Sequence, residues 1–307
     1  MATQQGLARQ RLRYRCSSSI LNWKDKIEKR FELKEGWGLG HTIFFGCYHI
    51  GDYLRILLHR GKRTIFWCGS DLRDLSWWKS LIIKHIKARH VVETNQGEWV
   101  RLHNLGIDAE VLPQFFGDPN EFQLCFKPSD TPHVFMNCHQ GRGKEYGLDI
   151  IELIAGQVPE ITFHVYGVRK PFHEIWEERL MGFPTTYPTG KFHNVEYATR
   201  SNIKYHGKVS EEQFNEEIKN YHAGLRLNKF DGNSDVVMKS VLLGQYPITY
   251  LQYPHIDCCE TTETTKPLIR LLKELKQKKV ANPASEYWRQ RLSVNKNILL
   301  QEEQNQI

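Results

Sequence analysis

Apolar and polar residues follow two rhythms along this chain: short apolar runs, and longer stretches whose apolar residues recur at helical spacing. The first helical stretch is marked by Ile20, Trp23, Ile27 and Phe31, which recur every three or four residues. Short runs of β-branched and aromatic residues bounded by glycine or polar residues predict strands. The first set of predicted strands is Thr42–Cys47, Thr64–Cys68, His90–Glu93 and Ala109–Leu112, and the helices between them are Asp52–His59, Leu75–Ile86 and Gln96–Leu105.

A second alternating set follows a connection without periodicity. Residues 113–132 are rich in Pro, Asp, Phe and Gly, which suits a link between domains. The second set comprises strands Val134–Cys138, Ile161–Tyr166, Ile203–His206, Gly224–Asn228 and Pro247–Tyr250, helices Tyr146–Ala155, Glu211–Tyr221 and Ser234–Leu243, and C-terminal helices Thr264–Lys279 and Ser285–Leu300.

Two sets of alternating strands and helices predict an α/β protein with two doubly wound, Rossmann-like parallel-sheet domains that face a cleft. We expect residues 1–125 to form the first domain, with a trimmed sheet, and residues 126–307 to form the second, with closing helices. In such sheets ligands bind at the carboxyl ends of the strands. One larger α/β domain is the structural alternative.

Composition is that of a globular protein, with 40% hydrophobic and 25% charged residues and a mean hydropathy of −0.54. No apolar run approaches the ~18 residues of a spanning helix. The polar, Arg-rich N-terminus does not have the pattern of a secretory signal. Seven cysteines without CxxC spacing are typical of free thiols in a reducing compartment, so we expect a cytoplasmic protein.

Residues 1–125 carry nearly all of the formal net charge of +7. Four of these charges are Arg9, Arg11, Arg13 and Arg15, so a solvated surface with a basic tail is one explanation. The other is a surface that meets an anionic acceptor.

Residues 230–248 carry the strongest chemical signal. The run from Asp231 to Ser234 is a small polar turn, and an apolar helix and a glycine stop follow it. Backbone N–H groups and the helix dipole at such a turn can hold a phosphate or a sugar hydroxyl. The segment resembles the donor-binding segment of GT-B-fold glycosyltransferases of the glycosyltransferase-4-like kind.

This resemblance implies roles for individual residues. Asp231 takes the first acidic position and would contact the transferred sugar, while Gly232 and Asn233 let the backbone approach it. Ser234 ends this donor-binding turn. The second acidic position of the pattern, which holds the ribose, is Lys239 here. An ammonium only donates hydrogen bonds, so Lys239 would bind phosphate or face solvent. The resemblance also implies that the closing helix packs back against the first domain.

A Gly-rich basic loop follows the predicted strand Val134–Cys138. Arg142 and Lys144 could neutralise a diphosphate leaving group as its charge builds. Similar glycosyltransferases have an Arg and a Lys here, but the lysine position is Tyr146 in this chain, so Lys144 would reach in from two residues earlier. An exposed turn with two solvated cations is the alternative. Lys208 and Val209 follow another strand and glycine and are weaker candidates for donor contacts.

Three residues at strand ends of the first domain are candidates for a general base. Inverting sugar transfer needs a carboxylate or imidazole to deprotonate the acceptor, whereas retaining transfer does not. The candidates are His49, Asp52 and above all Asp71, which lies in a turn similar to the family's "WHGSD" with Cys68 in place of histidine. Each could instead cap a helix. The histidines lack ligand spacing, so we expect a metal-independent protein.

These observations predict a glycosyltransferase of the hexosyltransferase type that uses a UDP- or GDP-sugar as co-substrate. The basic first domain suits an anionic acceptor: DNA with a hydroxymethylated pyrimidine, as in DNA modification by bacteriophage enzymes, or a lipid-linked or phosphorylated glycan at a membrane surface. The departures at Lys239, Tyr146 and Cys68 also fit a non-catalytic GT-B-like protein that binds nucleotides or nucleic acid.

Overall fold

The computed structural model describes residues 12–36, 40–73, 75–139, 142–169, 171, 200–259 and 265–301. Contacts between residues divide the chain into two compact units. Unit 1 contains the chain up to Glu121, residues Phe230–Asn233 and the chain from Arg289 onward; unit 2 contains Phe122–Lys229 and Ser234–Trp288. The prediction of two α/β bodies rather than one is confirmed. The predicted roles of residues 1–125 and 126–307 stay predictions.

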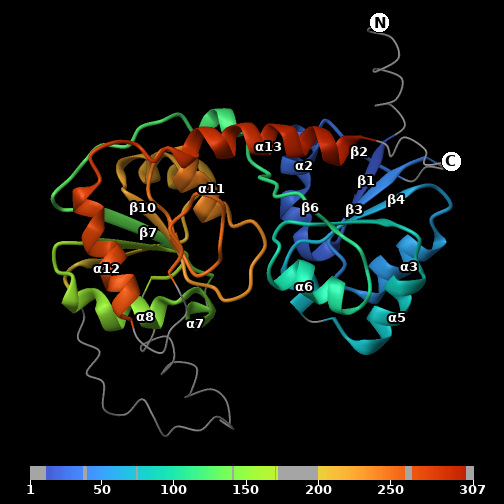
Figure 1. Cartoon of the computed structure of the whole chain (residues 1–307), viewed down its shortest axis with the longest axis horizontal. Helices are drawn as coiled ribbons and strands as arrows, with labels where there is room; N and C mark the ends of the chain where they lie inside the picture. Colours follow the sequence, from blue (N-terminus) through green and yellow to red (C-terminus); the bar gives the residue numbers. More distant parts are fainter. Residues whose placement is uncertain are drawn as a thin grey trace, which may run out of the picture. The chain divides into compact units, whose positions relative to one another are not determined.

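Unit 1 is built on a parallel sheet of six strands in the order β2-β1-β3-β4-β5-β6 (Figure 1). Its strands are β1 (Arg13–Cys16), β2 (Lys34–Glu35), β3 (Thr42–Phe45), β4 (Arg63–Phe66), β5 (Arg89–Val92) and β6 (Glu110–Val111), and its helices are η1 (Ser18–Trp23), α2 (Lys24–Phe31), α3 (Ile50–Leu58), α4 (Ser70–Arg73), α5 (Trp77–His85), α6 (Gly97–Asn104) and η2 (Pro119–Glu121).

Strand β1 corrects the assignment of Arg13 and Arg15 to a basic tail. Arg13 and Arg15 are half-buried and alternate with Tyr14 and Cys16, which are buried, as expected for a strand. All four residues of β1 pair with β3. The tail residues Arg9 and Arg11 lie outside the described residues.

Helices cover both faces of the unit 1 sheet because alternate strand residues point to opposite sides. Phe45 packs in a core with residues of α2, whereas Phe44 packs in a second core with residues of α3, α5 and α6. The end of the C-terminal helix α13 (Ala284–Leu300) belongs to unit 1, as expected, and Leu299 joins the α2 core.

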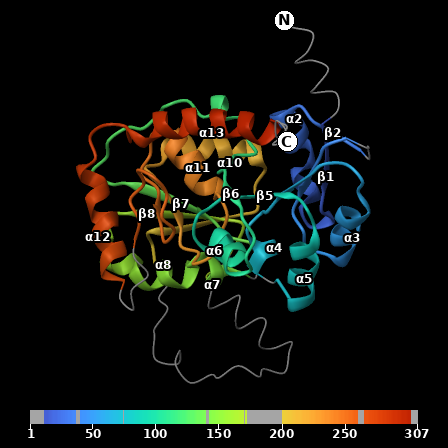
Figure 2. The ribbon, with the colours of Figure 1, turned by 45° about the vertical axis from the view of Figure 1, so that its right-hand side comes forward.

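Unit 2 has a parallel sheet of five strands in the order β11-β10-β7-β8-β9. Figure 2 shows α8 on one side of this sheet, with α10 and α11 on the other. The strands are β7 (His133–Asn137), β8 (Thr162–Tyr166), β9 (Ile203–Gly207), β10 (Ala223–Arg226) and β11 (Ile248–Thr249), and the helices are α7 (Gly143–Tyr146), α8 (Leu148–Ile154), η3 (Ala155–Gln157), α10 (Glu211–Glu217), η4 (Ile218–Asn220), α11 (Asp235–Leu242), α12 (Lys266–Glu274), η5 (Leu275–Gln277) and the start of α13.

A row of histidines crosses the strands of the unit 2 sheet. His133 Nδ1 lies 2.8 Å from His164 Nε2, and His164 Nδ1 lies 2.9 Å from His206 Nε2. The Tyr221 hydroxyl also lies 3.0 Å from His164 Nδ1, and Glu217 lies at the His206 end. Each ring can donate to one neighbour and accept from the other only if it is neutral. Burial accordingly lowers the pKa of His164 to about 3, with the rings of His133 and His206 adding to the effect.

Candidate functional site

The strand order of unit 2 places a ligand site at the carboxyl end of its central strand. From β7 the chain continues to β8 on one side, and it later returns to β10 on the other. Loops that leave neighbouring strands in opposite directions open a crevice at this switch point, where ligands of doubly wound sheets bind. The residues that follow β7 and those that end β10 are therefore candidates for ligand contacts.

Two arginines meet at this point over one aromatic ring. Arg142 caps the N-terminus of α7, and its guanidinium carbon lies 5.7 Å from the centre of the Tyr146 ring. Arg226 ends β10, and its guanidinium carbon lies 4.4 Å from the same centre. A guanidinium over a ring is attracted to the π face, and guanidinium groups are well suited to binding phosphate. The Tyr146 ring thus brings two cations together at the switch point.

Arg142 is already engaged by one carboxylate. Its Nε donates to Glu145 Oε2 at 2.9 Å, and its Nη2 donates to the same oxygen. This hydrogen bond raises the pKa of Arg142. The pair is half exposed, so an incoming phosphate can compete with Glu145 for the guanidinium.

Arg226 was not predicted from the sequence. It is the last residue of a strand and has no motif around it, so only the packing on Tyr146 reveals its position. Arg226 also lies near Cys138, the residue that follows β7. Burial raises the pKa of the Cys138 thiol to about 12, and the positive charge of Arg226 partly counteracts this rise.

Two other predicted cations of unit 2, Lys144 and Lys208, lie on the surface. Lys144 is exposed in α7, and Lys208 is exposed directly after β9, with Val209 half-buried beside it. The structure places Lys144 within the same short helix as Tyr146, whereas Lys208 and Val209 follow a different strand. Residues 140 and 141 of the Gly-rich loop lie outside the described residues.

Ser234 caps the N-terminus of α11, which begins at the predicted place. Its backbone N–H donates to the Tyr253 hydroxyl at 3.3 Å. Its own hydroxyl is buried and has no hydrogen-bond partner among the described residues. A buried hydroxyl of this kind costs free energy unless a further group pairs with it.

Lys239 does not face solvent, and that expectation is wrong. The side chain is only 5% exposed; its ammonium lies 3.2 Å from Glu211 Oε1 and over the rings of Phe122 and Phe214. A buried ammonium requires such a partner because desolvation opposes its charge. Phosphate binding by Lys239 stays a prediction, and within unit 2 the residue ties α11 to α10.

In unit 1, the segment 230–233 is held by groups that follow β5 and β6, and it lies close to the loop that follows β4. The Asn233 backbone N–H donates to Glu93 Oε2 at 2.9 Å, and the Asn233 side chain donates to the Gln114 carbonyl at 2.6 Å. A Cβ on Gly232 would overlap Glu93 Oε2, and one on Gly69 would lie 2.8 Å from Gly232 N. A side chain at Gly232 would therefore displace the Glu93 carboxylate from its hydrogen bond with Asn233, while the predicted sugar contact of Asp231 stays a prediction.

Glu98 fixes the backbone of Glu93, the residue that binds this segment. Glu98 is fully buried; its Oε2 accepts the backbone N–H groups of Glu93 and Thr94 at 2.9 and 3.0 Å, while its Oε1 has no hydrogen-bond partner among the described residues. Burial and the neighbouring Asp71 and Asp231 carboxylates raise its pKa well above the usual range. Neither Glu93 nor Glu98 was predicted. Glu98 lies in the first turn of α6, where a lone glutamate is typical of helix capping, and Glu93 follows β5 without a motif around it.

Asp71, the leading candidate base, is buried and used by the backbone. It accepts from the Cys47 N–H at 3.0 Å and from the Cys68 N–H at 3.1 and 3.2 Å, so it joins the loops that follow β3 and β4. Burial raises its pKa to about 6, although these backbone donors lower it. This geometry suits a positioning role, and proton abstraction by Asp71 stays a prediction.

His49 and Asp52 lie at the N-terminus of α3, His49 as the residue before the helix and Asp52 in its first turn. Asp52 Oδ2 accepts from Ser17 Oγ and from the backbone N–H groups of Tyr48 and His49 at 2.7–3.1 Å, so it caps α3. His49 is exposed, and its Nε2 lies 2.8 Å from Ser19 Oγ. Of the three predicted bases, only His49 presents its side chain to solvent.

The described ranges contain no group of three or more His, Cys, Asp or Glu residues placed to hold a metal ion. Across the same part of the chain, no helix has the length and apolar character needed to cross a bilayer.

Comparison with known proteins identifies the fold. No protein-family model and no curated protein sequence matches this chain. Among solved structures, the pneumococcal O-GlcNAc transferase GtfA in complex with UDP and GlcNAc matches at 10% identity and a TM-score of 0.54, over 91% of this chain and 57% of that one. Anabaena HepE in complex with UDP matches at 12% identity and a TM-score of 0.59, over 90% of this chain and 80% of that one.

Sucrose-phosphate synthase from Thermosynechococcus elongatus matches at 13% identity and a TM-score of 0.57, over 90% of this chain and 72% of that one. The chain spans 57% and 56% of the lengths of GtfA and of TarM, another match. These likenesses show that the chain has the GT-B glycosyltransferase fold, as predicted.

Proposed function

We propose that this protein is a glycosyltransferase that takes a sugar from a nucleoside-diphosphate-sugar and transfers it to a hydroxyl of an anionic acceptor. The observation that carries the proposal is the pair of arginines, Arg142 and Arg226, stacked on Tyr146 at the switch point of the unit 2 sheet. A diphosphate gains charge as its bond to the sugar breaks, and fixed cations stabilise that charge.

Two further groups of unit 2 are proposed as contacts to the donor. Lys144 adds a further cation, and the N-terminus of α11 at Ser234 offers a buried, unpaired hydroxyl and the positive end of a helix dipole. HepE and GtfA hold UDP in their solved structures, so we propose a UDP-sugar ahead of a GDP-sugar. The sugar contact of Asp231, Gly232 and Asn233, which belong to unit 1, stays a prediction from the sequence.

Unit 1 would receive the acceptor. If the transfer inverts the anomeric centre, His49 is the best placed of the proposed bases, since Asp52 and Asp71 hold backbone groups. If it retains the configuration, no base is needed, and Asp71 acts only by fixing the loops after β3 and β4. NMR of the product linkage, made by the wild type and by His49→Ala, distinguishes these cases.

Calorimetric titration with a panel of UDP- and GDP-sugars tests donor binding. Arg226→Ala should weaken binding about 10- to 100-fold, as expected for a lost charge-assisted hydrogen bond. Arg291→Ala, which removes an exposed arginine of unit 1, is the matched control and should leave the affinity unchanged. Absence of binding by every donor, or an equal loss in both variants, would refute the proposal.

The acceptor is proposed from charge. DNA with a hydroxymethylated pyrimidine and a lipid-linked or phosphorylated glycan both fit the basic N-terminal part of the chain. A gel-shift titration against salt separates them, because a DNA-modifying enzyme should show a steep salt slope on duplex DNA. No shift at low salt would exclude DNA.

A non-catalytic binding protein is the second candidate, and one observation favours it. Two of the three predicted bases, Asp52 and Asp71, are consumed by backbone hydrogen bonds. Asp231→Asn distinguishes the candidates: an enzyme should lose UDP release while retaining its fold, whereas a binding protein shows no UDP release in either form.

A further inference from the structure

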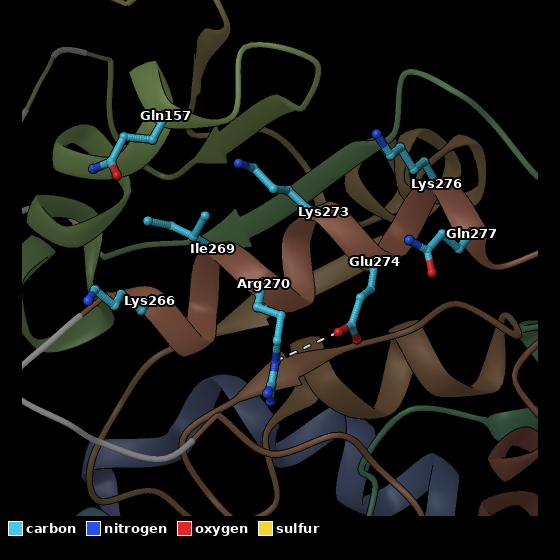
Figure 3. A pocket seen from close by; sticks show the side chains of 8 residues that line it. All are labelled: Gln157, Lys266, Ile269, Arg270, Lys273, Glu274, Lys276 and Gln277. Carbon is cyan, nitrogen blue, oxygen red and sulfur yellow. Dashed lines mark ion pairs between the residues drawn. The ribbon is translucent and has the colours of Figure 1, made fainter.

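A basic groove on unit 2 lies away from the switch point. It is lined by residues of α12, η5 and η3 and has a volume of about 640 Å³ (Figure 3). Four of its residues are cations and one is an acid; the lining residues are Gln157, Lys266, Ile269, Arg270, Lys273, Glu274, Lys276 and Gln277. Four positive charges against one negative charge leave a formal charge of +3 on the groove.

The cations form one stripe because of their helical spacing. Residues 266, 270, 273 and 276 are four, three and three positions apart, which places them along one side of a helix. With a rise of about 1.5 Å per residue, successive cations lie about 4.5–6 Å apart along the axis. The opposite side of α12 is apolar and packs in the core through Leu268 and Leu272.

Most of this charge is not neutralised by the protein. Arg270 pairs with Glu274 at 3.7 Å, as the dashed line in Figure 3 marks. Lys266, Lys273 and Lys276 are exposed and form no ion pair with another described residue. By contrast, the next two lysines of the chain, Lys278 and Lys279, pair with Asp257 and Asp130.

We propose that this groove binds a linear phosphate-bearing polymer, independently of the nucleotide site. The spacing of the cations suits successive phosphates of a flexible chain, and the open groove can accept the chain along the helix. Gln157 and Gln277 add amides that can donate hydrogen bonds to phosphate oxygens, and Ile269 completes the lining. A flat membrane surface would not need the concave shape.

Inorganic polyphosphate carrying a fluorescent label is the probe, and its binding is followed by anisotropy at several salt concentrations. With four contacts and a slope of about −0.7 per contact, the wild type should show a log–log salt slope of about −3. The double variant Lys266→Gln/Lys273→Gln should reduce the slope to about −1.4 and weaken binding about 25-fold near 0.1 M salt.

The matched control is Lys278→Gln/Lys279→Gln, which removes the same charge from neighbouring positions where both lysines are paired. It should bind polyphosphate within about twofold of the wild type, since its lost cations are outside the groove. The variant Lys266→Arg/Lys273→Arg, which keeps both charges, should retain binding. Circular dichroism of all variants confirms that the fold is kept.

Three results would overturn the proposal. They are no binding of polyphosphate by the wild type, equal weakening by the two double glutamine variants, and binding to phosphatidylserine vesicles without binding to polyphosphate. The last would assign the groove to a membrane surface. None of them bears on donor binding at Arg142 and Arg226, which calorimetry with nucleotide-sugars measures separately.

Discussion

Acidification should destabilise unit 2 through its row of histidines, and His164 allows the size of the effect to be calculated. The pKa of this residue is about 3 in the folded protein against 6.5 as the ordinary value. Between these values the unfolded chain binds a proton that the folded chain does not. The stability from neutral His164 is therefore complete above pH 6.5 and is lost as the pH falls.

The magnitude follows from these two pKa values. Between about pH 7.5 and about pH 5, the unfolded state gains about 2 kcal/mol of protonation free energy at His164, and the full difference approaches about 5 kcal/mol near pH 3. His133, His206 and Tyr221 face the His164 ring, and Lys204 adds a repulsive charge. The Glu217 carboxylate lies at the far end of the row, 3.9 Å from His206 Nδ1, and is not among the groups that shift the pKa of His164.

Urea unfolding at the two pH values, followed by hydrogen exchange of peptides from β7 and β8, measures this loss in unit 2. His164→Gln removes the titrating group but keeps one donor and one acceptor. The wild type should therefore lose about 2 kcal/mol more than this variant on acidification. His85→Gln, a change at an exposed histidine, should behave as the wild type. Equal losses in the wild type and in His164→Gln would refute the assignment of a neutral, buried imidazole row.

Two substitutions test the packing around the candidate site. Gly232→Ala should destabilise unit 1 by about 2 kcal/mol, because the added Cβ would overlap the Glu93 carboxylate. The control Gly51→Ala has open space around the added Cβ and should be neutral or slightly stabilising. Similar melting temperatures for the two variants would contradict this packing. Lys239→Met should change the free energy of unfolding by no more than about 1 kcal/mol, because an apolar side chain replaces the buried ion pair with Glu211. A loss of UDP affinity with unchanged stability would instead show that the Lys239 ammonium binds the donor.

The alternation of strands and helices could be predicted because each element is short and amphipathic or apolar throughout. The starts of α3, α11 and β10 lie within two residues of the predictions. Strand β1 was missed because Arg13 and Arg15 dominate the pattern of a four-residue run. Only its pairing with β3 shows that the intervening Tyr14 and Cys16 form part of the core.

Site residues were predictable where they sit in local motifs and unpredictable where tertiary contacts define them. Arg142 and Ser234 lie at helix N-termini, which the sequence marks directly. Arg226 becomes a site residue only because Tyr146, eighty positions earlier, lies beneath it. Likewise, Lys239 is buried because Glu211, from another helix, supplies its counter-charge.

Hydrogen exchange of the protein with and without UDP tests the central claim most directly. We predict protection by UDP of peptides that contain Arg142–Tyr146, the end of β10 and the start of α11, and loss of this protection in Arg226→Ala. Protection at the α12 groove alone, or none in any of these segments, would contradict a nucleotide site at the carboxyl edge of the unit 2 sheet.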